Sequence, residues 1–295
     1  MAQSAPVAPP PIALRSKNLG DLGQKVMEFA LTERLGTQYC EKHVQGPQEI
    51  GKGADYVIED LKLAIEVKFW IRSGDGMMTD ADIDSHVKQR FKDYHGEWRR
   101  YLVMMGKRPK QWFRIAQRSR KCRIRPFSIP YDSVIRGMRD MDVLDIAAES
   151  RGFVVEEWAR RTYEWFRPSL LMVLTLALGE YTRMDDDEWR EICSIVMANR
   201  KVDPLGNWKR RGRRAERDER GIVDGLLQAI SANAGARTIG RSRSTANNRL
   251  REWQRDGTWS SIIRRLGELR FGSLSAETRQ SLGMPNSSQT LPEGV

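Results

Sequence analysis

The sequence predicts an α/β domain with a mixed sheet flanked by helices, followed by an all-α region. Two adjacent strand patterns, at 53–60 and 61–70, come soon after a helical pattern at 18–36. Beyond residue 138 the apolar residues recur at helical spacing instead. The chain has 295 residues, of which 40% are hydrophobic, so it is long enough to bury the cores of two domains.

The first helical pattern opens a domain that we expect to span residues 18–138. Leu22, Val26 and Ala30 share one helical face, and Gly36 is a natural C-terminal stop. After the two strand patterns we expect a loop over 71–84, a helix over 82–100, a strand over 100–106 and a last strand over 123–135. Trp112 and Phe113 precede a run of arginines and lysines, an arrangement that suits nucleic acid or, more plainly, a solvated basic loop.

The two strand patterns together form the most informative part of the chain. In a strand, alternate side chains point to opposite faces. One face of the 61–70 strand is then wholly apolar and comprises Leu61, Leu63, Ile65, Val67 and Phe69. Glu66 and Lys68 share the other face. The 53–60 run reads as the preceding strand, and the turn at Glu59 and Asp60 lays it antiparallel to the next, so that Asp55 lies beside Glu66.

Two carboxylates and an ammonium on one hairpin have a chemical use. Neighbouring carboxylates repel each other unless a cation compensates. Hard oxygen ligands with room for water suit Mg²⁺, for which Mn²⁺ is an expected substitute. Such an ion activates water and stabilises charge at a phosphodiester, and Lys68 is positioned to orient the water or neutralise developing charge. The plain alternative is a strand whose Glu66 and Lys68 merely face water.

The Asp55 and Glu66-Val67-Lys68 pattern resembles the PD-(D/E)xK nuclease superfamily, which has the restriction-endonuclease-like fold. The resemblance covers roughly residues 19–105. In that family the metal is held by the two acids and by the backbone carbonyl between Glu and Lys. The resemblance therefore implies Asp55, Glu66 and Val67 as metal ligands, with Asp55, Glu66 and Lys68 as catalytic residues.

Many members of this family also use a Glu or Gln from the first helix. Gln24 and Glu28 lie four residues apart and hence on one helical face. The resemblance implies Glu28 as a further catalytic residue, with Gln24 as the alternative. A solvated helix face explains the same spacing without any catalytic role.

The charge of the chain favours a polyanionic partner. The net charge is +11, and residues 200–270 hold eighteen Lys or Arg against eight Asp or Glu, an excess of ten. We expect a helical linker domain over 139–200, with Pro168 opening its second helix. A basic linker follows at 201–219, in which Lys209, Arg210 and Arg211 are candidates for DNA contacts or for a solvated hinge.

Residues 220–271 are predicted to form a helix-turn-helix-like DNA-binding domain. A helix over 221–235 and a turn at Ile239 precede a second helix over 244–254, in which Leu250 and Trp253 are expected to be buried. A recognition helix presents polar residues of its N-terminal half to base edges and phosphates. The candidates are Arg241, Arg243, Ser244, Thr245, Asn247, Asn248 and Arg251.

This segment resembles the N-terminal DNA-binding region of insertion-sequence transposases. The matching residues are Arg249, Leu250, Trp253, Gln254, Asp256, Gly257, Thr258 and Trp259. The acidic catalytic domain of those transposases has no counterpart in this sequence, so the resemblance implies DNA binding and not their chemistry. We expect Trp253 and Trp259 to be core residues.

These observations together predict a Mg²⁺-dependent DNA endonuclease of a restriction, anti-phage or mobile-element type. Two alternatives stay open: a non-catalytic DNA-binding adaptor with a degenerate nuclease fold, and a structure-specific nuclease such as a junction resolvase. Besides DNA, the candidate partners are a second copy of the chain and another protein of a defence or mobile-element system. Three scattered cysteines suit a cytoplasmic location, and the longest apolar run is too short for a membrane span. We expect disordered tails at 1–17 and 272–295.

Overall fold

The computed structural model describes residues 12–47, 53–70, 87–106, 112–130, 154–198, 219–234 and 243–272. Several predictions lie outside these ranges: the loop at 71–84, the basic linker with Lys209, Arg210 and Arg211, the turn with Arg241, and the outer parts of both tails.

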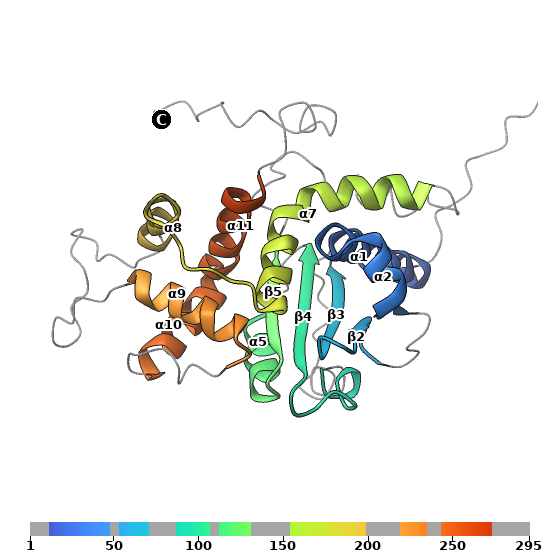
Figure 1. Ribbon diagram of the computed structural model, residues 1–295, viewed down its shortest axis with the longest axis horizontal. Helices are drawn as coiled ribbons and strands as arrows, with labels where there is room; N and C mark the ends of the chain where they lie inside the picture. Colours follow the sequence, from blue (N-terminus) through green and yellow to red (C-terminus); the bar gives the residue numbers. More distant parts are fainter. Residues whose placement is uncertain are drawn as a thin grey trace, which may run out of the picture.

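Five strands form one mixed sheet in the order β1-β2-β3-β4-β5 (Figure 1). They are β1 (Val44–Gln45), β2 (Tyr56–Ile58), β3 (Leu63–Trp70), β4 (Arg99–Gly106) and β5 (Arg125–Ile129). The first three strands pair antiparallel, whereas β3, β4 and β5 pair parallel. The predicted antiparallel hairpin is confirmed, with Tyr56 opposite Ile65.

The helices pack around this sheet. They are α1 (Ile12–Leu35), α2 (Thr37–His43), α5 (Trp112–Lys121), α7 (Val154–Leu178), α8 (Asp186–Ala198), α9 (Glu219–Ser231), α10 (Arg243–Asp256) and α11 (Thr258–Phe271). Figure 1 shows α8 to α11 gathered at the β5 end of the sheet, with α1 and α2 at the β2 end. The predicted mixed sheet flanked by helices and the largely helical remainder are both present. None of the described helices has the length and apolar character needed to cross a membrane.

The two faces of the sheet carry different kinds of residue. One face, here called the bundle face, carries Leu63, Ile65 and Val67 and packs against α1, α7, α9 and α11 in one hydrophobic cluster. The opposite face, here called the site face, carries Ala64, Glu66 and Lys68, and its apolar residues pack against α5. This division follows from the alternation of side chains along β3. Leu61 is an exception to the prediction, because it lies in the turn before β3 and is 38% exposed.

Pro168 does not start a new helix as predicted. It lies inside α7, and Figure 1 shows that this helix changes direction partway along its length. Proline removes one backbone hydrogen bond and bends a helix without always ending it. At this point α11 crosses closely, because a Cβ on Gly267 would overlap the carbonyl oxygen of Pro168. Packing against α11 therefore accompanies the continuation of the helix through the proline.

Three other predicted boundaries also change. Helix α1 begins at Ile12, inside the predicted N-terminal tail and directly after three prolines, which suit a helix start. The predicted helix over 82–100 is wrong in its second half, because the described chain is helical at 87–90 and turns at 91–93. Gly96 has a φ of 68°, which a helix does not contain. The Arg99 N–H then donates to the Lys62 carbonyl at 2.7 Å, and β4 begins at Arg99. The basic run after Trp112 forms helix α5 and not a loop.

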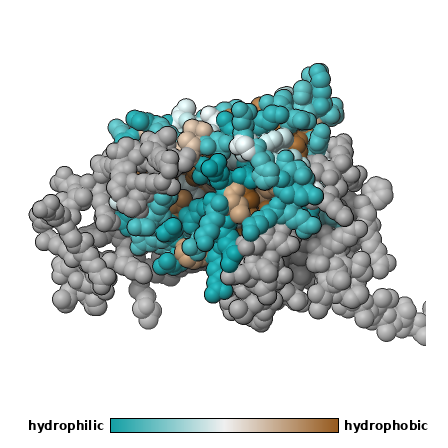
Figure 2. Space-filling model, turned by 90° about the horizontal axis from the view of Figure 1, so that it is seen from below, coloured by the Kyte–Doolittle hydropathy of each residue, from teal (hydrophilic) through white to brown (hydrophobic). Residues whose placement is uncertain are grey.

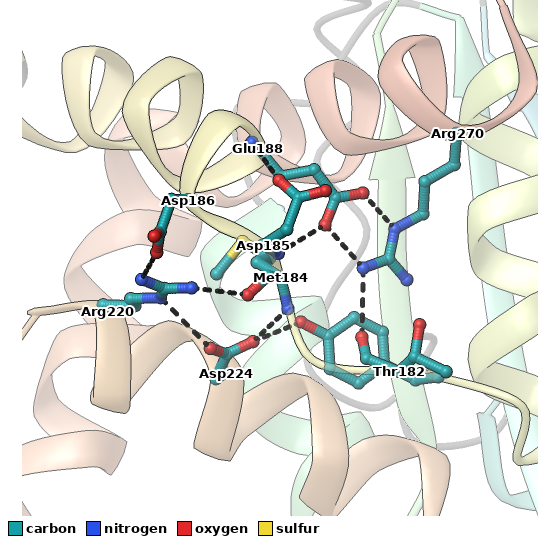
Figure 3. A network of polar contacts seen from close by, with 9 residues as sticks. Thr182, Met184, Asp185, Asp186, Glu188, Arg220, Asp224 and Arg270 are labelled. Atoms are coloured by element: carbon teal, nitrogen blue, oxygen red, sulfur yellow. Dashed lines mark hydrogen bonds and ion pairs between the residues drawn. The ribbon is translucent and has the colours of Figure 1, made fainter.

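Polar contacts hold the connection between α7 and α8 against α9 and α11 (Figure 3). The buried Asp224 of α9 accepts hydrogen bonds from the Tyr181 hydroxyl at 2.5 Å and from the Met184 N–H at 3.2 Å. Arg270 of α11 pairs with Glu188 of α8 at 2.7 Å. Since this connection, α9 and α11 all carry members of the network, the C-terminal helices form one packed group.

Candidate active site and candidate DNA-contacting helix

Asp55 lies where the pairing between β2 and β3 ends. Tyr56 is the first residue of β2, and beyond its pair with Ile65 the next β3 amide in the ladder pattern is that of Val67. The Asp55 carboxylate takes the place of a backbone partner, because its Oδ2 accepts the Val67 N–H at 2.7 Å. Asp55 is 5% exposed, so this hydrogen bond fixes a buried carboxylate beside the middle of β3.

Glu66 points from β3 into the same region of the site face and is only 1% exposed. Its Oε1 lies 2.5 Å from the Lys68 Nζ and 3.5 Å from the Arg90 Nε. Burial raises the pKa of Glu66 to about 7, since Lys68 only partly opposes this effect and Asp55 adds to it. The structure therefore brings Asp55, Glu66 and Lys68 together, as predicted from the alternation of β3.

Helix α1 contributes Gln24 to this group. The Gln24 Nε2 donates to Asp55 Oδ1 at 2.8 Å, and the Gln24 carbonyl accepts the Tyr56 hydroxyl at 2.5 Å. Glu28, the residue implied first by the family resemblance, instead forms an ion pair with Lys25 at 2.8 Å and is half exposed. Within the described ranges, no three His, Cys, Asp or Glu side chains form a group suited to a metal ion. The residue of α1 that hydrogen-bonds Asp55 is therefore Gln24, whereas the ion-pair partner of Glu28 is Lys25.

Arg90 also belongs to the site, although the sequence analysis did not predict this. Its Nη1 donates to the carbonyl of Gly53, two residues before Asp55, at 3.0 Å, while its Nε lies 3.5 Å from Glu66 Oε1. The guanidinium therefore bridges the segment before β2 and the acid of β3. No spacing in the sequence indicates this contact, because Arg90 reaches the site from beyond the long segment that follows β3.

The candidate recognition helix is α10, which is slightly longer than predicted. Leu250, Trp253 and Trp259 are buried as expected, and the two indole rings stack with centroids 6.3 Å apart. Asn248 and Arg251 are exposed, whereas Thr245 and Asn247 are half-buried. For Arg243 and Ser244 the structure describes the helical backbone alone. Two of the candidate contacts, Asn248 and Arg251, are thus exposed on the surface of α10.

Comparisons with protein-family models, with curated proteins and with solved structures found no match for this chain. Any functional conclusion therefore depends on the residues and on the geometry described above.

Proposed function

We propose that this protein is a metal-dependent DNA endonuclease whose active site consists of Asp55, Glu66 and Lys68. One observation carries the proposal: two buried carboxylates and an ammonium meet at one point of a sheet face that carries a hydrophobic cluster. Burying charged groups is costly, and strongly shifted pKa values cluster at functional sites. The Asp and Glu-x-Lys arrangement on a mixed sheet, with a helix before it, supports a nuclease of the restriction-endonuclease-like type.

The residues of the site fit a hard divalent cation. Asp55 and Glu66 offer carboxylate oxygens, and mutual repulsion of the two acids is one cause of the raised pKa of Glu66. The two acids and the Val67 carbonyl would hold Mg²⁺ or Mn²⁺, which would supply nucleophile activation and charge stabilisation for phosphodiester hydrolysis. The family resemblance supports the same three ligands.

The remaining polar residues have roles that follow from their contacts. Lys68 carries an ammonium next to Glu66, where it would stabilise negative charge on the scissile phosphate. Gln24 and the Val67 N–H each donate to a different oxygen of Asp55, so the orientation of that carboxylate is fixed before substrate binds. Arg90 would hold Glu66 in position and add positive charge at the phosphate.

DNA targeting is the second part of the proposal. Helix α10 exposes Asn248, a side-chain type that pairs with adenine in the major groove, and Arg251, whose cation suits a phosphate contact. Trp253 of α10 stacks on Trp259 of α11, a contact that would keep the helix in place. The excess of ten positive charges over 200–270 supports a role of this region in binding DNA. Restriction, anti-phage defence and transposition are all consistent with this pairing of functions.

The deciding experiment is cleavage of supercoiled plasmid by the full chain with Mg²⁺, with Mn²⁺ and with EDTA. We expect nicked or linear product with either metal and none with EDTA. Asp55→Ala and Glu66→Ala should abolish cutting while DNA binding persists. Asp187→Ala, which removes a highly exposed acid of α8, is the matched control and should cut normally. Wild-type cutting by both active-site variants would refute the assignment, and binding without cutting by the wild type would favour the adaptor.

A further inference from the structure

Helix α5 presents positive charge beside the candidate recognition helix. Its inner side is buried, with Trp112, Ile115 and Ala116 in the hydrophobic cluster of the site face. It contains four basic residues and no acidic one: Arg114, Arg118, Arg120 and Lys121. Helix α10 packs directly against α5, and both lie at the lower edge of Figure 1. The described surface seen from below is predominantly hydrophilic (Figure 2).

Cations of the two helices meet at this contact. The Arg255 guanidinium of α10 lies over the Phe113 ring of α5, 4.8 Å from its centroid. Arg120 of α5 has a buried Nη2 atom with no hydrogen-bond partner in the described part of the protein. Burial lowers the pKa of Arg120 to about 10, and the nearby charge of Arg251 contributes, although the group stays cationic at neutral pH. Burial and the nearby Arg251 thus both disfavour the charged form of Arg120.

The acids of α10 do not neutralise these cations. Glu252 pairs with Arg249 at 2.9 Å, and the Asp256 Oδ1 accepts hydrogen bonds from Thr258 at 2.7 and 2.9 Å. Three of the cations are exposed and form no ion pair within the described ranges: Arg114, Lys121 and Arg251. A polyanion would supply the negative charge that these three cations do not receive from the described residues.

We infer that α5 and α10 together form one phosphate-binding surface for the backbone of duplex DNA. We call it the α5–α10 surface and define it by Arg114, Arg120, Lys121, Arg251 and Arg255. The inference deepens the proposed function, on which it rests, because it extends the DNA contact from α10 to a helix of the α/β domain. Four cations and no acid on α5 suit contacts to phosphates, which position a duplex.

The aromatic residues favour a duplex over a single strand. Binding of unpaired nucleic acid uses exposed aromatic rings on which bases stack. On α5, Trp112 is buried and Phe113 is covered by Arg255, so neither ring offers an open stacking platform. A surface with cations and without such rings matches the regular phosphate rows of a double helix.

The α5–α10 surface also has a defined relation to the candidate active site. Leu102 and Met104 of β4 pair with Glu66 and Lys68 of β3. Both β4 residues belong to the same hydrophobic cluster as Ile115 of α5. The helix that carries the basic residues is therefore packed on the sheet face from which the catalytic side chains project.

The test measures duplex binding by the full chain in EDTA, so that cleavage plays no part. The variant Arg114→Glu/Lys121→Glu changes α5 alone. The control Arg183→Glu/Arg190→Glu makes the same charge change at two exposed positions near or on α8. We expect the α5 variant to bind a short duplex at least about tenfold more weakly and to lower the salt slope by about two. The control should stay within about twofold of wild type, because it removes no phosphate contact.

Several results would overturn the inference. Equal losses in the two variants would mean that net charge alone matters, and an unchanged α5 variant would mean that α5 contacts no phosphate. Tighter binding of single-stranded DNA or of duplex RNA than of duplex DNA would refute the partner. If the charge reversal unfolds the protein by near-ultraviolet circular dichroism, Arg114→Gln/Lys121→Gln replaces it with the same criteria. Failure of plasmid cleavage would leave the binding result intact, so the two proposals fail separately.

Discussion

Glu66 shows how the surroundings of one residue link stability to pH. Its pKa is raised from 4.5 to about 7, chiefly by burial. The folded protein therefore favours the protonated acid. The associated stability is fully present below about pH 4.5 and is lost as the pH rises through about 7. At higher pH a buried negative charge remains, which Lys68 compensates only in part.

Replacing Glu66 with glutamine should therefore stabilise the metal-free protein at alkaline pH. The amide keeps the shape of the protonated acid without its charge. We expect the free energy of unfolding of Glu66→Gln to be close to that of wild type near pH 4.5 and to exceed it by about 3 kcal/mol at pH 8. Urea unfolding in EDTA across this range provides the measurement. A difference between the two proteins that does not change with pH would show that Glu66 keeps an ordinary pKa.

Gln24 and Glu28 make a matched pair for a second test at the residue scale. Gln24 donates to Asp55 Oδ1, whereas Glu28 pairs with Lys25 at the surface. A hydrogen bond to a charged group contributes roughly 1.5–3 kcal/mol. We expect Gln24→Ala to slow plasmid nicking by about tenfold or more, and Glu28→Ala to change it less than about threefold. The opposite order of rates would restore Glu28 as the catalytic residue of α1.

At the scale of the element, the crossing of α7 and α11 depends on a glycine. A Cβ at Gly267 would overlap the Pro168 carbonyl oxygen and would lie 3.2 Å from the Ser169 nitrogen. Both atoms belong to the backbone and cannot rotate away, so we expect Gly267→Ala to cost about 3 kcal/mol or more. Guanidinium unfolding would measure the loss.

Gly20 of α1 provides the control for this substitution. It also lies inside a helix, but nothing lies within 4 Å of the position that a Cβ would take. Gly20→Ala should stabilise the protein by up to about 1 kcal/mol, since alanine favours the helix. If Gly267→Ala also stabilised the protein, the close approach of α7 and α11 would be incorrect.

The local sequence pattern was sufficient to predict some elements and insufficient to predict others. The β2–β3 hairpin follows from alternation and from a turn of few residues, so the meeting of Asp55 with Glu66 could be inferred. The path of α7 through Pro168 could not, because it accompanies packing against Gly267, which lies far away in the sequence. Arg90 was missed for the same reason, since its contacts with Gly53 and Glu66 are tertiary.

At the scale of the whole molecule, the sheet and the C-terminal helices are joined by arginines and a tyrosine. Arg99 at the start of β4 donates to the Ala177 carbonyl near the end of α7, at 3.0 Å. Arg125 at the start of β5 donates to the Ala234 carbonyl just after α9, at 2.7 Å. The buried Tyr101 hydroxyl reaches the carbonyls of both helical segments. Cations favour the C-terminal ends of helices, so these contacts stabilise the attachment.

Because of this shared core, we expect the sheet and the helices to unfold together. One hydrophobic cluster includes Leu22 of α1, Val103 of β4 and Leu266 of α11. Native-state hydrogen exchange should give the slowest amides of β4 and α11 the same free energy of opening. Opening of α9 to α11 at a free energy several kcal/mol lower than that of β4 would instead reveal two independent units.

Helix α5 gives the proposed enzyme the properties of a ruler. A nuclease tethered by a flexible chain reaches many phosphodiesters and produces a spread of cuts. Here the inner side of α5 packs on the sheet face that also carries Glu66 and Lys68, and α5 also contacts α10. In the proposed enzyme, one short helix would thus set the offset between DNA contact and cut. Mapping the ends of cleaved DNA at single-nucleotide resolution should show a constant position relative to the bound site, and a broad ladder of ends would exclude such a ruler.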